Sequence, residues 1–168
     1  DILVNNVGTN IRKPTLEWTQ EDWRRVFETN VASAWELSRA SFPMLKESRG
    51  CIVNLSSGSA ARATMTSTAP YGMTKAAMDH LTRHLACEWG AMGIRVNSVL
   101  PWYVRTPLTA KVFQDPQRVE TILASIPAGR IGEPADVARA VAFLCMPAAS
   151  WINGVQLPVD GGFMALGI

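Results

Sequence analysis

Three short apolar runs, separated by long segments, constrain the fold of this chain more than any other feature. They are Ile2–Val4, Cys51–Leu55 and Ile94–Leu100, of which only the first is wholly apolar, and mainly apolar runs of this length are typical of strands buried on both faces of a parallel sheet. Parallel strands need a long crossover between them, which is usually a helix. The sequence therefore predicts an α/β protein with a doubly wound, mainly parallel sheet.

The segments between and after these runs carry the helices that such a topology requires. Residues 20–47 repeat apolar side chains at helical spacing, and Gly50 is expected to end that helix. A second helix is expected from about Ala69 to Trp89, and a third from about Glu133 to Cys145 with a proline and acidic residues in its first turn. A last strand is expected near Val155–Val159. Strand and helix alternate along the chain.

The composition is that of one globular domain. The 168 residues are 48% hydrophobic and 18% charged, which suffices for a single core, and no linker divides residues 1–168. The regular pattern breaks between residues 102 and 127, where two proline-interrupted pieces predict short helices or a mobile lobe. We therefore expect a single domain with one irregular lobe.

Charge and hydropathy exclude several classes of partner. A net charge of +2 from scattered basic residues does not indicate a nucleic-acid or membrane surface, and no apolar run approaches the roughly 18 residues of a spanning helix. Cys51, Cys87 and Cys145 lie in apolar contexts, which predicts buried thiols in a reducing compartment. We expect a soluble, cytoplasmic protein that acts on small molecules or associates with copies of itself.

Two histidines at helical spacing are the only candidate metal ligands. His80 and His84 lie one turn apart with Glu88 a further turn on, which is a conceivable zinc site. The pattern lacks the glutamate of His-Glu-x-x-His, so we interpret the histidines as a surface or subunit-contact pair and predict no metal.

Tyr71 and Lys75 carry the clearest chemistry. They lie four residues apart in Pro70-Tyr-Gly-Met-Thr-Lys75, so one helical turn places a phenol beside a cation. A neighbouring ammonium favours the phenolate and lowers the pKa of a phenol toward neutral pH. The pair therefore suits proton transfer to a carbonyl oxygen, although the same spacing also occurs as a simple surface contact.

The motifs around this pair resemble the short-chain dehydrogenase/reductase family. In order they are Asp1-Ile-Leu-Val-Asn-Asn-Val-Gly8, Glu28-Thr-Asn30, Ile52-Val-Asn-Leu-Ser-Ser57, Asn97-Ser-Val-Leu-Pro101 and Val159-Asp-Gly-Gly162. The resemblance covers the chain almost end to end and implies a Rossmann-like fold. Four segments are most similar to the plant tropinone reductase group: Asp1–Pro14, Leu85–Trp89, Pro101-Trp102 and Phe143–Ser150.

The resemblance implies a role for each member of a catalytic tetrad. Tyr71 would donate the proton, Lys75 would lower the pKa of the phenol and hold the ribose, and Ser57 would bind the carbonyl oxygen. Asn30 would support a water that links the lysine to solvent; from its place on an apolar helix stripe, a buried structural hydrogen bond is the alternative. The spacing from Ser57 to Tyr71 is about one residue longer than is common in the family. We expect the extra residue in the loop of residues 61–68, and Ser59 is the alternative to Ser57.

The resemblance also implies a nicotinamide cofactor. Its contacts would come from Asn5, Asn6, Gly8, Tyr71, Lys75, Pro101, Val104 and Thr106. NADP(H) is favoured because the resembling group mostly uses it, with NAD(H) as the alternative. Trp102 stands where relatives carry a glycine after Pro101, and an indole there would narrow or cap the site.

The implied reaction interconverts a ketone and a secondary alcohol by hydride transfer. The lobe of residues 102–127 would form the substrate pocket, and its composition favours an apolar or bulky carbonyl compound with few charges to hold an anion. The residues concerned are Trp102, Tyr103, Leu108, Val112, Phe113, Ile122 and Ile126. The family implies a homodimer or homotetramer.

The glycine-rich turn that holds a dinucleotide's phosphates precedes the Asn-Asn strand in relatives and has no counterpart here. We therefore expect the N-terminal part of the fold to be missing from this chain, with Ile2–Val4 as an unpaired edge. The alternative function is a truncated, non-catalytic fragment or pseudoenzyme that keeps the fold and the subunit-interface helices.

Overall fold

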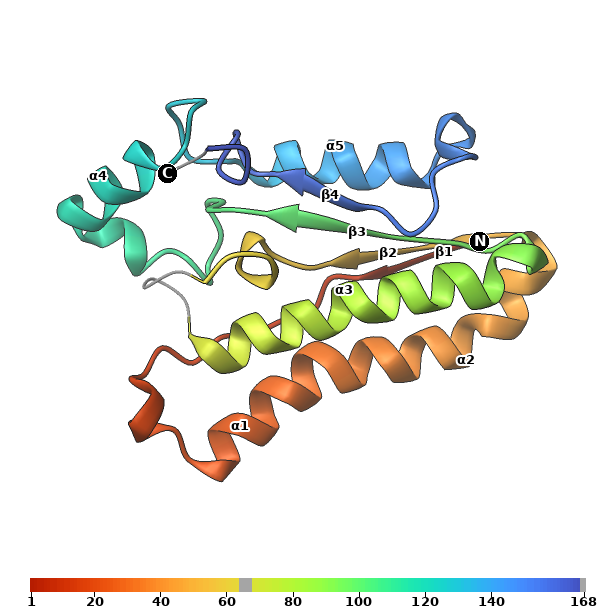
Figure 1. Ribbon diagram of the computed structural model, residues 1–168, viewed down its shortest axis with the longest axis horizontal. Coiled ribbons are helices and arrows are strands. Elements are labelled where there is room, and N and C mark those ends of the chain that lie inside the picture. The colour runs from red at the N-terminus through yellow and green to blue at the C-terminus, as the bar shows by residue number, and fades with distance from the viewer. Residues whose placement is uncertain (64–67, 167–168) are drawn as a thin grey trace.

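The computed structural model describes residues 1–63 and 68–166, which form a four-stranded parallel sheet (Figure 1). The strands are β1 (Ile2–Asn5), β2 (Cys51–Leu55), β3 (Arg95–Pro101) and β4 (Gln156–Val159), and they lie side by side in that order. Each neighbouring pair is parallel. The predicted α/β fold with a parallel sheet is confirmed.

Helices cover both faces of the sheet. Figure 1 shows α1 (Gln20–Phe27), α2 (Ser33–Ser48) and α3 (Ala69–Trp89) on one side and α5 (Pro134–Cys145) on the other. The short helix α4 (Pro116–Ala124) lies beyond the carboxyl ends of the strands. Single turns of 3₁₀ helix complete the chain at Thr15–Glu17, Gly58–Ala60, Gly90–Met92, Val112–Gln114 and Pro147–Ala149.

The core consists of one apolar layer on each face of the central strands. On the α2 and α3 side, Ile52 and Val96 pack with Leu85 and Trp89, and on the α5 side Val53 and Val99 pack with Leu144. Successive residues of a strand point to opposite faces, so a strand with both faces covered must be apolar throughout. Every residue of β2 is buried, which explains why it could be identified from its sequence. Both layers hold the carboxyl ends of the strands in place for the site.

The helix expected over residues 20–47 is interrupted by one wide turn. A capping box between Thr19 and Asp22 begins α1, and a π-helical turn at Glu28–Ala32 then separates α1 from α2. Such single π turns are rare and occur mostly at functional sites. Asn30 lies inside this turn and is completely buried.

The end of α2 differs from the expected glycine cap. Arg49, not Gly50, adopts the left-handed conformation, with φ of 52°. Gly50 is needed for space instead, because a Cβ there would lie 2.2 Å from the carbonyl oxygen of Asp1 at the start of β1. The glycine thus sets the close approach of two neighbouring strand starts.

The lobe of residues 102–127 has an apolar core of its own. Val112 and Ile122 bury against Tyr103 and Ile126 in this cluster, and Phe113 packs on it. The expectation that all the apolar residues of the lobe form the substrate pocket is therefore wrong for Val112, Phe113 and Ile122, which support the lobe from inside.

The cysteines differ in exposure. Cys51 is buried and Cys145 is half-buried, but Cys87 is exposed, so the expectation of three buried thiols is wrong for Cys87. Among the described residues, no helix is both long enough and apolar enough to cross a membrane.

Candidate active site

Tyr71 and Lys75 lie on the first two turns of α3, and Figure 1 shows that α3 begins at the carboxyl ends of the strands. Pro70 starts the helix at a position where its missing N–H has no helical partner. The Lys75 ammonium, 3% exposed, lies 5.8 Å from the centre of the Tyr71 ring. It donates a hydrogen bond to the carbonyl oxygen of Leu55 at 2.6 Å, where β2 ends. The structure thus brings the predicted pair to the end of the central strand.

Lys75 is a buried cation outside any ion pair of the described residues. Burial lowers its pKa from 10.5 to about 8, because the charged form is poorly solvated, and the negative charge of Asp79 partly opposes this effect. Asp79 lies one turn further along α3 and accepts a hydrogen bond from Ser98 at 3.0 Å. Near neutral pH the lysine is charged and close to its titration point.

The Tyr71 phenol does not have the lowered pKa expected from its neighbour. Burial raises the pKa of Tyr71, while a hydrogen bond with Ser57 and the positive charge of Arg12 act in the opposite direction. The Lys75 ammonium is directed to the Leu55 carbonyl oxygen and lies 5.8 Å from the centre of the phenol ring. Burial is the largest of these effects, so the phenol stays protonated near neutral pH.

Ser57, rather than Ser59, is the serine beside Tyr71. Its side chain is buried and its hydroxyl accepts a hydrogen bond from the backbone N–H of Ser59 at 3.1 Å. That bond fixes the Ser57 oxygen at the start of the turn Gly58–Ala60. The extra residue of the loop, expected between residues 61 and 68, falls largely on 64–67, outside the described residues.

Asn30 makes three hydrogen bonds through its side chain. Its amide NH₂ donates to the carbonyl oxygen of Thr9 at 2.9 Å and to the hydroxyl of Thr74 at 3.0 Å, and its carbonyl oxygen accepts from the Thr9 N–H at 2.7 Å. These bonds tie the π turn to the loop after β1 and to α3. Asn30 thus makes the buried structural hydrogen bonds that were the alternative to a role in a proton path. Its bond to Thr74 connects it to α3, the helix that carries Lys75.

A cavity of about 520 Å³ opens beside this group, a size usual for a small-molecule site. Five of the residues expected to contact the cofactor line it together with Ser57, Tyr71 and Lys75: Asn6, Gly8, Pro101, Val104 and Thr106. Sequence reasoning missed its opposite wall, formed by α5 residues such as Val137 and Val141. In the sequence, only the helical spacing of the apolar residues of α5 could have indicated this wall of the cavity.

Gly8 shows that the chain passes close to the catalytic group. A Cβ at Gly8 would lie 3.3 Å from the Lys75 nitrogen and 3.5 Å from the Asn30 side-chain oxygen. The glycine therefore lets the loop after β1 approach the lysine closely, and the cavity that Gly8, Tyr71 and Lys75 line fits the nicotinamide end of a cofactor. Asn5 does not line this cavity; it is buried and donates to Asn54 at 2.8 Å, which ties β1 to β2.

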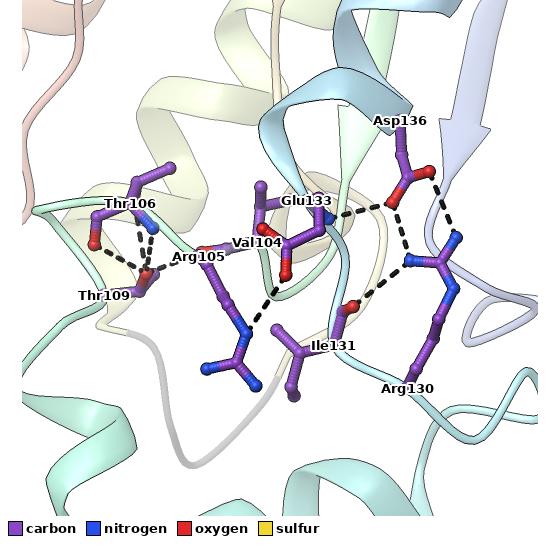
Figure 2. A network of polar contacts seen from close by, with 8 residues as sticks. All are labelled: Val104, Arg105, Thr106, Thr109, Arg130, Ile131, Glu133 and Asp136. Atoms are coloured by element: carbon purple, nitrogen blue, oxygen red, sulfur yellow. Dashed lines mark hydrogen bonds and ion pairs between the residues drawn. The ribbon is translucent and has the colours of Figure 1, made fainter.

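The backbone at Val104 and Thr106 is held by Thr109, a residue that the sequence did not single out. The Thr109 hydroxyl donates to the Val104 carbonyl oxygen at 2.6 Å and accepts from the Thr106 N–H at 3.1 Å (Figure 2). Threonine often makes such local bonds to nearby backbone, which is the only signal that could have found it. The hydroxyl fixes the loop that borders the cavity.

The same loop is anchored to the start of α5. The backbone of Arg105 donates to the Gly132 carbonyl oxygen at 2.9 Å, and its side chain pairs with Glu133 at 3.1 Å. Arg130 in turn binds both carboxylate oxygens of Asp136, at 2.7 and 3.1 Å (Figure 2). The carboxylate also accepts the Glu133 N–H at 2.9 Å. These bonds set the position of the cavity edge at Val104.

A second, smaller cavity of about 70 Å³ lies on another side of Tyr71 and Ser57. It shares Trp102, Leu108 and Thr109 with the large cavity, but Asn10 and Arg12 line only the small one. Neither residue was predicted for the site, because both lie in the loop after β1 with no motif of their own. The fold brings this loop to the lobe, where Arg12 donates to the Leu108 carbonyl oxygen at 3.4 Å.

The histidines of α3 lie away from both cavities. His84 is exposed and lies 3.2 Å from Glu88 on the helix surface. Within residues 1–63 and 68–166 no group of three or more His, Cys, Asp or Glu side chains is arranged to hold a metal ion.

Comparison with protein families finds a match over residues 1–164 to the model described as enoyl-(acyl carrier protein) reductase. A tropinone reductase homologue of Arabidopsis thaliana is 46% identical over 168 residues, covering 99% of this chain and 63% of that protein. The senescence-associated protein 13 of the same plant is 47% identical over 162 residues, which is 60% of its length. The chain thus spans about three fifths of the curated relatives it matches.

Solved structures agree with the sequence matches. A putative NAD(P)-dependent gluconate 5-dehydrogenase from Beutenbergia cavernae, with bound NADP at low occupancy, superposes with a TM-score of 0.95 at 38% identity. The match covers 99% of this chain and 67% of that one.

Proposed function

Because the chain belongs to the short-chain dehydrogenase/reductase family, we propose that it forms the catalytic part of an NADP(H)-dependent oxidoreductase that interconverts a ketone and a secondary alcohol. The single observation that carries this proposal is the convergence of Ser57, Tyr71 and Lys75 on one cavity at the carboxyl end of the sheet. These residues come from two segments of the chain, and their side chains have the chemistry that carbonyl reduction needs.

In the proposed reduction, the carbonyl oxygen lies between the hydroxyls of Ser57 and Tyr71. Bound NADPH would supply the hydride that reduces the carbonyl carbon. Tyr71 donates its proton to the oxygen, so that the ketone, the hydride and one proton give the alcohol. The phenolate that remains is stabilised by the Ser57 hydroxyl and by the positive charges of Lys75 and Arg12 in a poorly solvated site.

To bind the cofactor, Lys75 must have a hydrogen-bond donor that the Leu55 carbonyl does not use. The ammonium carries three donors, and the Leu55 carbonyl and the Met78 sulfur engage two directions, at 2.6 and 3.5 Å. The remaining donor is free to face the cavity that the lysine lines. We infer that it holds the ribose of the cofactor, with Asn30 as the support of a proton path to solvent.

The preference for NADP(H) over NAD(H) is part of the proposal. Its support is the Beutenbergia cavernae relative, whose structure contains NADP. Comparison of the two reduced cofactors at equal concentration, with one ketone substrate, measures this preference directly.

The experiment that tests the function is Tyr71→Phe in the protein expressed from its complete coding region. The variant should lose ketone reduction by at least about 100-fold, the range of general acid catalysis, and should still bind NADPH. Reduction at an undiminished rate would overturn the assignment of Tyr71. The neighbouring change Met73→Leu, at an exposed position on the same helix, is the matched control.

A non-catalytic fragment or pseudoenzyme is the second candidate, favoured by the partial coverage of the relatives. Titration of the 168-residue chain with NADPH, followed by nicotinamide fluorescence, separates the two. Saturable binding supports the enzyme, whereas a chain that folds but does not bind supports the fragment.

We also infer a homodimer or homotetramer. The outer faces of α2 and α3 expose large apolar side chains, with Trp35 at 42%, Met44 at 62% and Met73 at 50%. Large exposed apolar side chains on a helical layer are one feature of subunit contacts. Analytical ultracentrifugation at micromolar concentration should show a species of two or four chains, and a monomer would contradict this inference.

A further inference from the structure

The small cavity beside Tyr71 has only one charged lining residue, and that residue is a cation. Arg12 lines it together with neutral side chains, among them Asn10, Ser59 and Tyr103. No ion pair within residues 1–63 and 68–166 includes Arg12. Its one side-chain hydrogen bond there, to the Leu108 carbonyl oxygen, is long at 3.4 Å and uses one of five donors. The guanidinium therefore keeps most of its binding capacity.

Arg12 lies close to the reacting group, because it lines the small cavity together with Tyr71 and Ser57. One small molecule in this cavity can therefore contact both the guanidinium and the phenol. The positive charge of Arg12 also opposes the rise in the pKa of Tyr71. Tyr71 and Ser57 line both cavities. A carbonyl held by these two hydroxyls would extend its substituent toward Arg12.

The size and chemistry of the cavity limit that substituent. The volume of about 70 Å³ is little more than twice the roughly 30 Å³ that one water occupies in the liquid. A guanidinium presents parallel N–H donors that match the two oxygens of a carboxylate. A compact anion is therefore favoured in this cavity, while a ligand with a positive charge would be repelled by Arg12.

We propose that Arg12 is a specificity-determining residue that binds a carboxylate next to the substrate's carbonyl, so that the substrate class is a 2-oxo acid or a similar anionic ketone. This inference rests on the proposed function, whose site it deepens. The sequence favoured an apolar substrate, because the lobe of residues 102–127 has few charges to hold an anion. Arg12 lies outside that lobe, so the proposed substrate is instead an anion.

A matched pair of substrates tests the proposal. Benzoylformate and its methyl ester share one skeleton and differ in the negative charge. The protein expressed from its complete coding region should prefer the acid, and Arg12→Gln should lower the ratio of kcat/KM for acid over ester by about 10- to 100-fold, the range of a charged hydrogen bond. Arg12→Lys should retain part of the preference. Arg39→Gln, an exposed residue paired with Glu36 on α2, should leave the ratio unchanged.

A binding measurement separates this proposal from the proposed function. Benzoate and the neutral benzamide are titrated against wild type and Arg12→Gln, with tryptophan fluorescence as the readout. Weaker benzoate binding by the variant, with benzamide unaffected, supports the anion site even in a protein that reduces neither ketone. An unchanged acid-to-ester ratio, or equal benzoate binding by wild type and variant, overturns it.

Discussion

The Lys75 ammonium donates a hydrogen bond to the carbonyl oxygen of Leu55 across 2.6 Å, and this bond fixes the first turns of α3 to the end of β2. The lysine is 3% exposed and has a lowered pKa because it is poorly solvated. A buried cation without a carboxylate partner destabilises a fold.

Lys75→Met should make the protein more stable while it removes activity. A shift of the Lys75 pKa from 10.5 to about 8 corresponds to about 3 kcal/mol of lost stability at neutral pH, of which the loss of the Leu55 hydrogen bond returns about 1 kcal/mol. We expect a net gain of about 2 kcal/mol in the free energy of unfolding by urea at about pH 7.

The same variant has a pH signature. The unfolded chain binds more protons than the folded one between the folded pKa of about 8 and the ordinary value of 10.5, so the stability contributed by Lys75 rises with pH across that window. The difference in the free energy of unfolding between Lys75→Met and wild type should therefore be smaller at about pH 9.5 than at about pH 7. A constant difference between the two proteins would contradict the assigned cause.

Asn30→Ala should destabilise the protein, because it removes three hydrogen bonds and leaves the part-buried N–H and carbonyl oxygen of Thr9 without their side-chain partner. We expect a loss of about 2–4 kcal/mol in urea unfolding, since orphaned buried groups lose about 1–3 kcal/mol each. Ser48→Ala, an exposed change near the end of α2, serves as the control. A stability equal to wild type would show that the three bonds contribute little.

Gly8→Ala should reduce turnover more than it reduces stability. The added methyl would lie 3.3 Å from the Lys75 nitrogen, so the ammonium must shift by a few tenths of an ångström. We expect kcat to fall by about tenfold, because small displacements of catalytic groups have large effects on rate. Val7→Ala, at an exposed neighbour outside the cavity lining, should retain wild-type kcat, and equal loss in both variants would rule out this steric cause.

Asp136→Asn should weaken the anchor of the cavity edge in a pH-dependent way. Hydrogen bonds from Arg130 and the Glu133 N–H hold the pKa of Asp136 at about 2, below its ordinary 3.8. The stability from this carboxylate is therefore present above about pH 4 and is lost as the pH falls toward 2. Wild type should melt slightly above the variant at about pH 6, because exposed ion pairs contribute little, and the difference should shrink as the pH falls from about 4 to below about 2. A difference that persists in acid would contradict the assignment.

Much of the fold could be predicted because its signals are local. The burial of β2 on both faces requires a mainly apolar run, and the period of α3 places Tyr71 one turn before Lys75. The π turn at Glu28–Ala32 and the left-handed Arg49 leave no comparable trace, since each is imposed by what packs against it. The position of Val104 at the cavity was predicted. The role of Thr109 was not, because it depends on how the backbone of Val104 and Thr106 folds around its hydroxyl.

The sequence by itself determined the order of strands and helices and the pairing of Tyr71 with Lys75 on one helix, because residues close in the chain encode the period of the structure they form. Only the tertiary structure decided that Arg12 lies beside Tyr71, that the Asn30 side chain binds Thr9, and that Lys75 is directed to Leu55. Those contacts join separate segments, and they exist only because the parallel sheet brings the carboxyl ends of its strands to one edge.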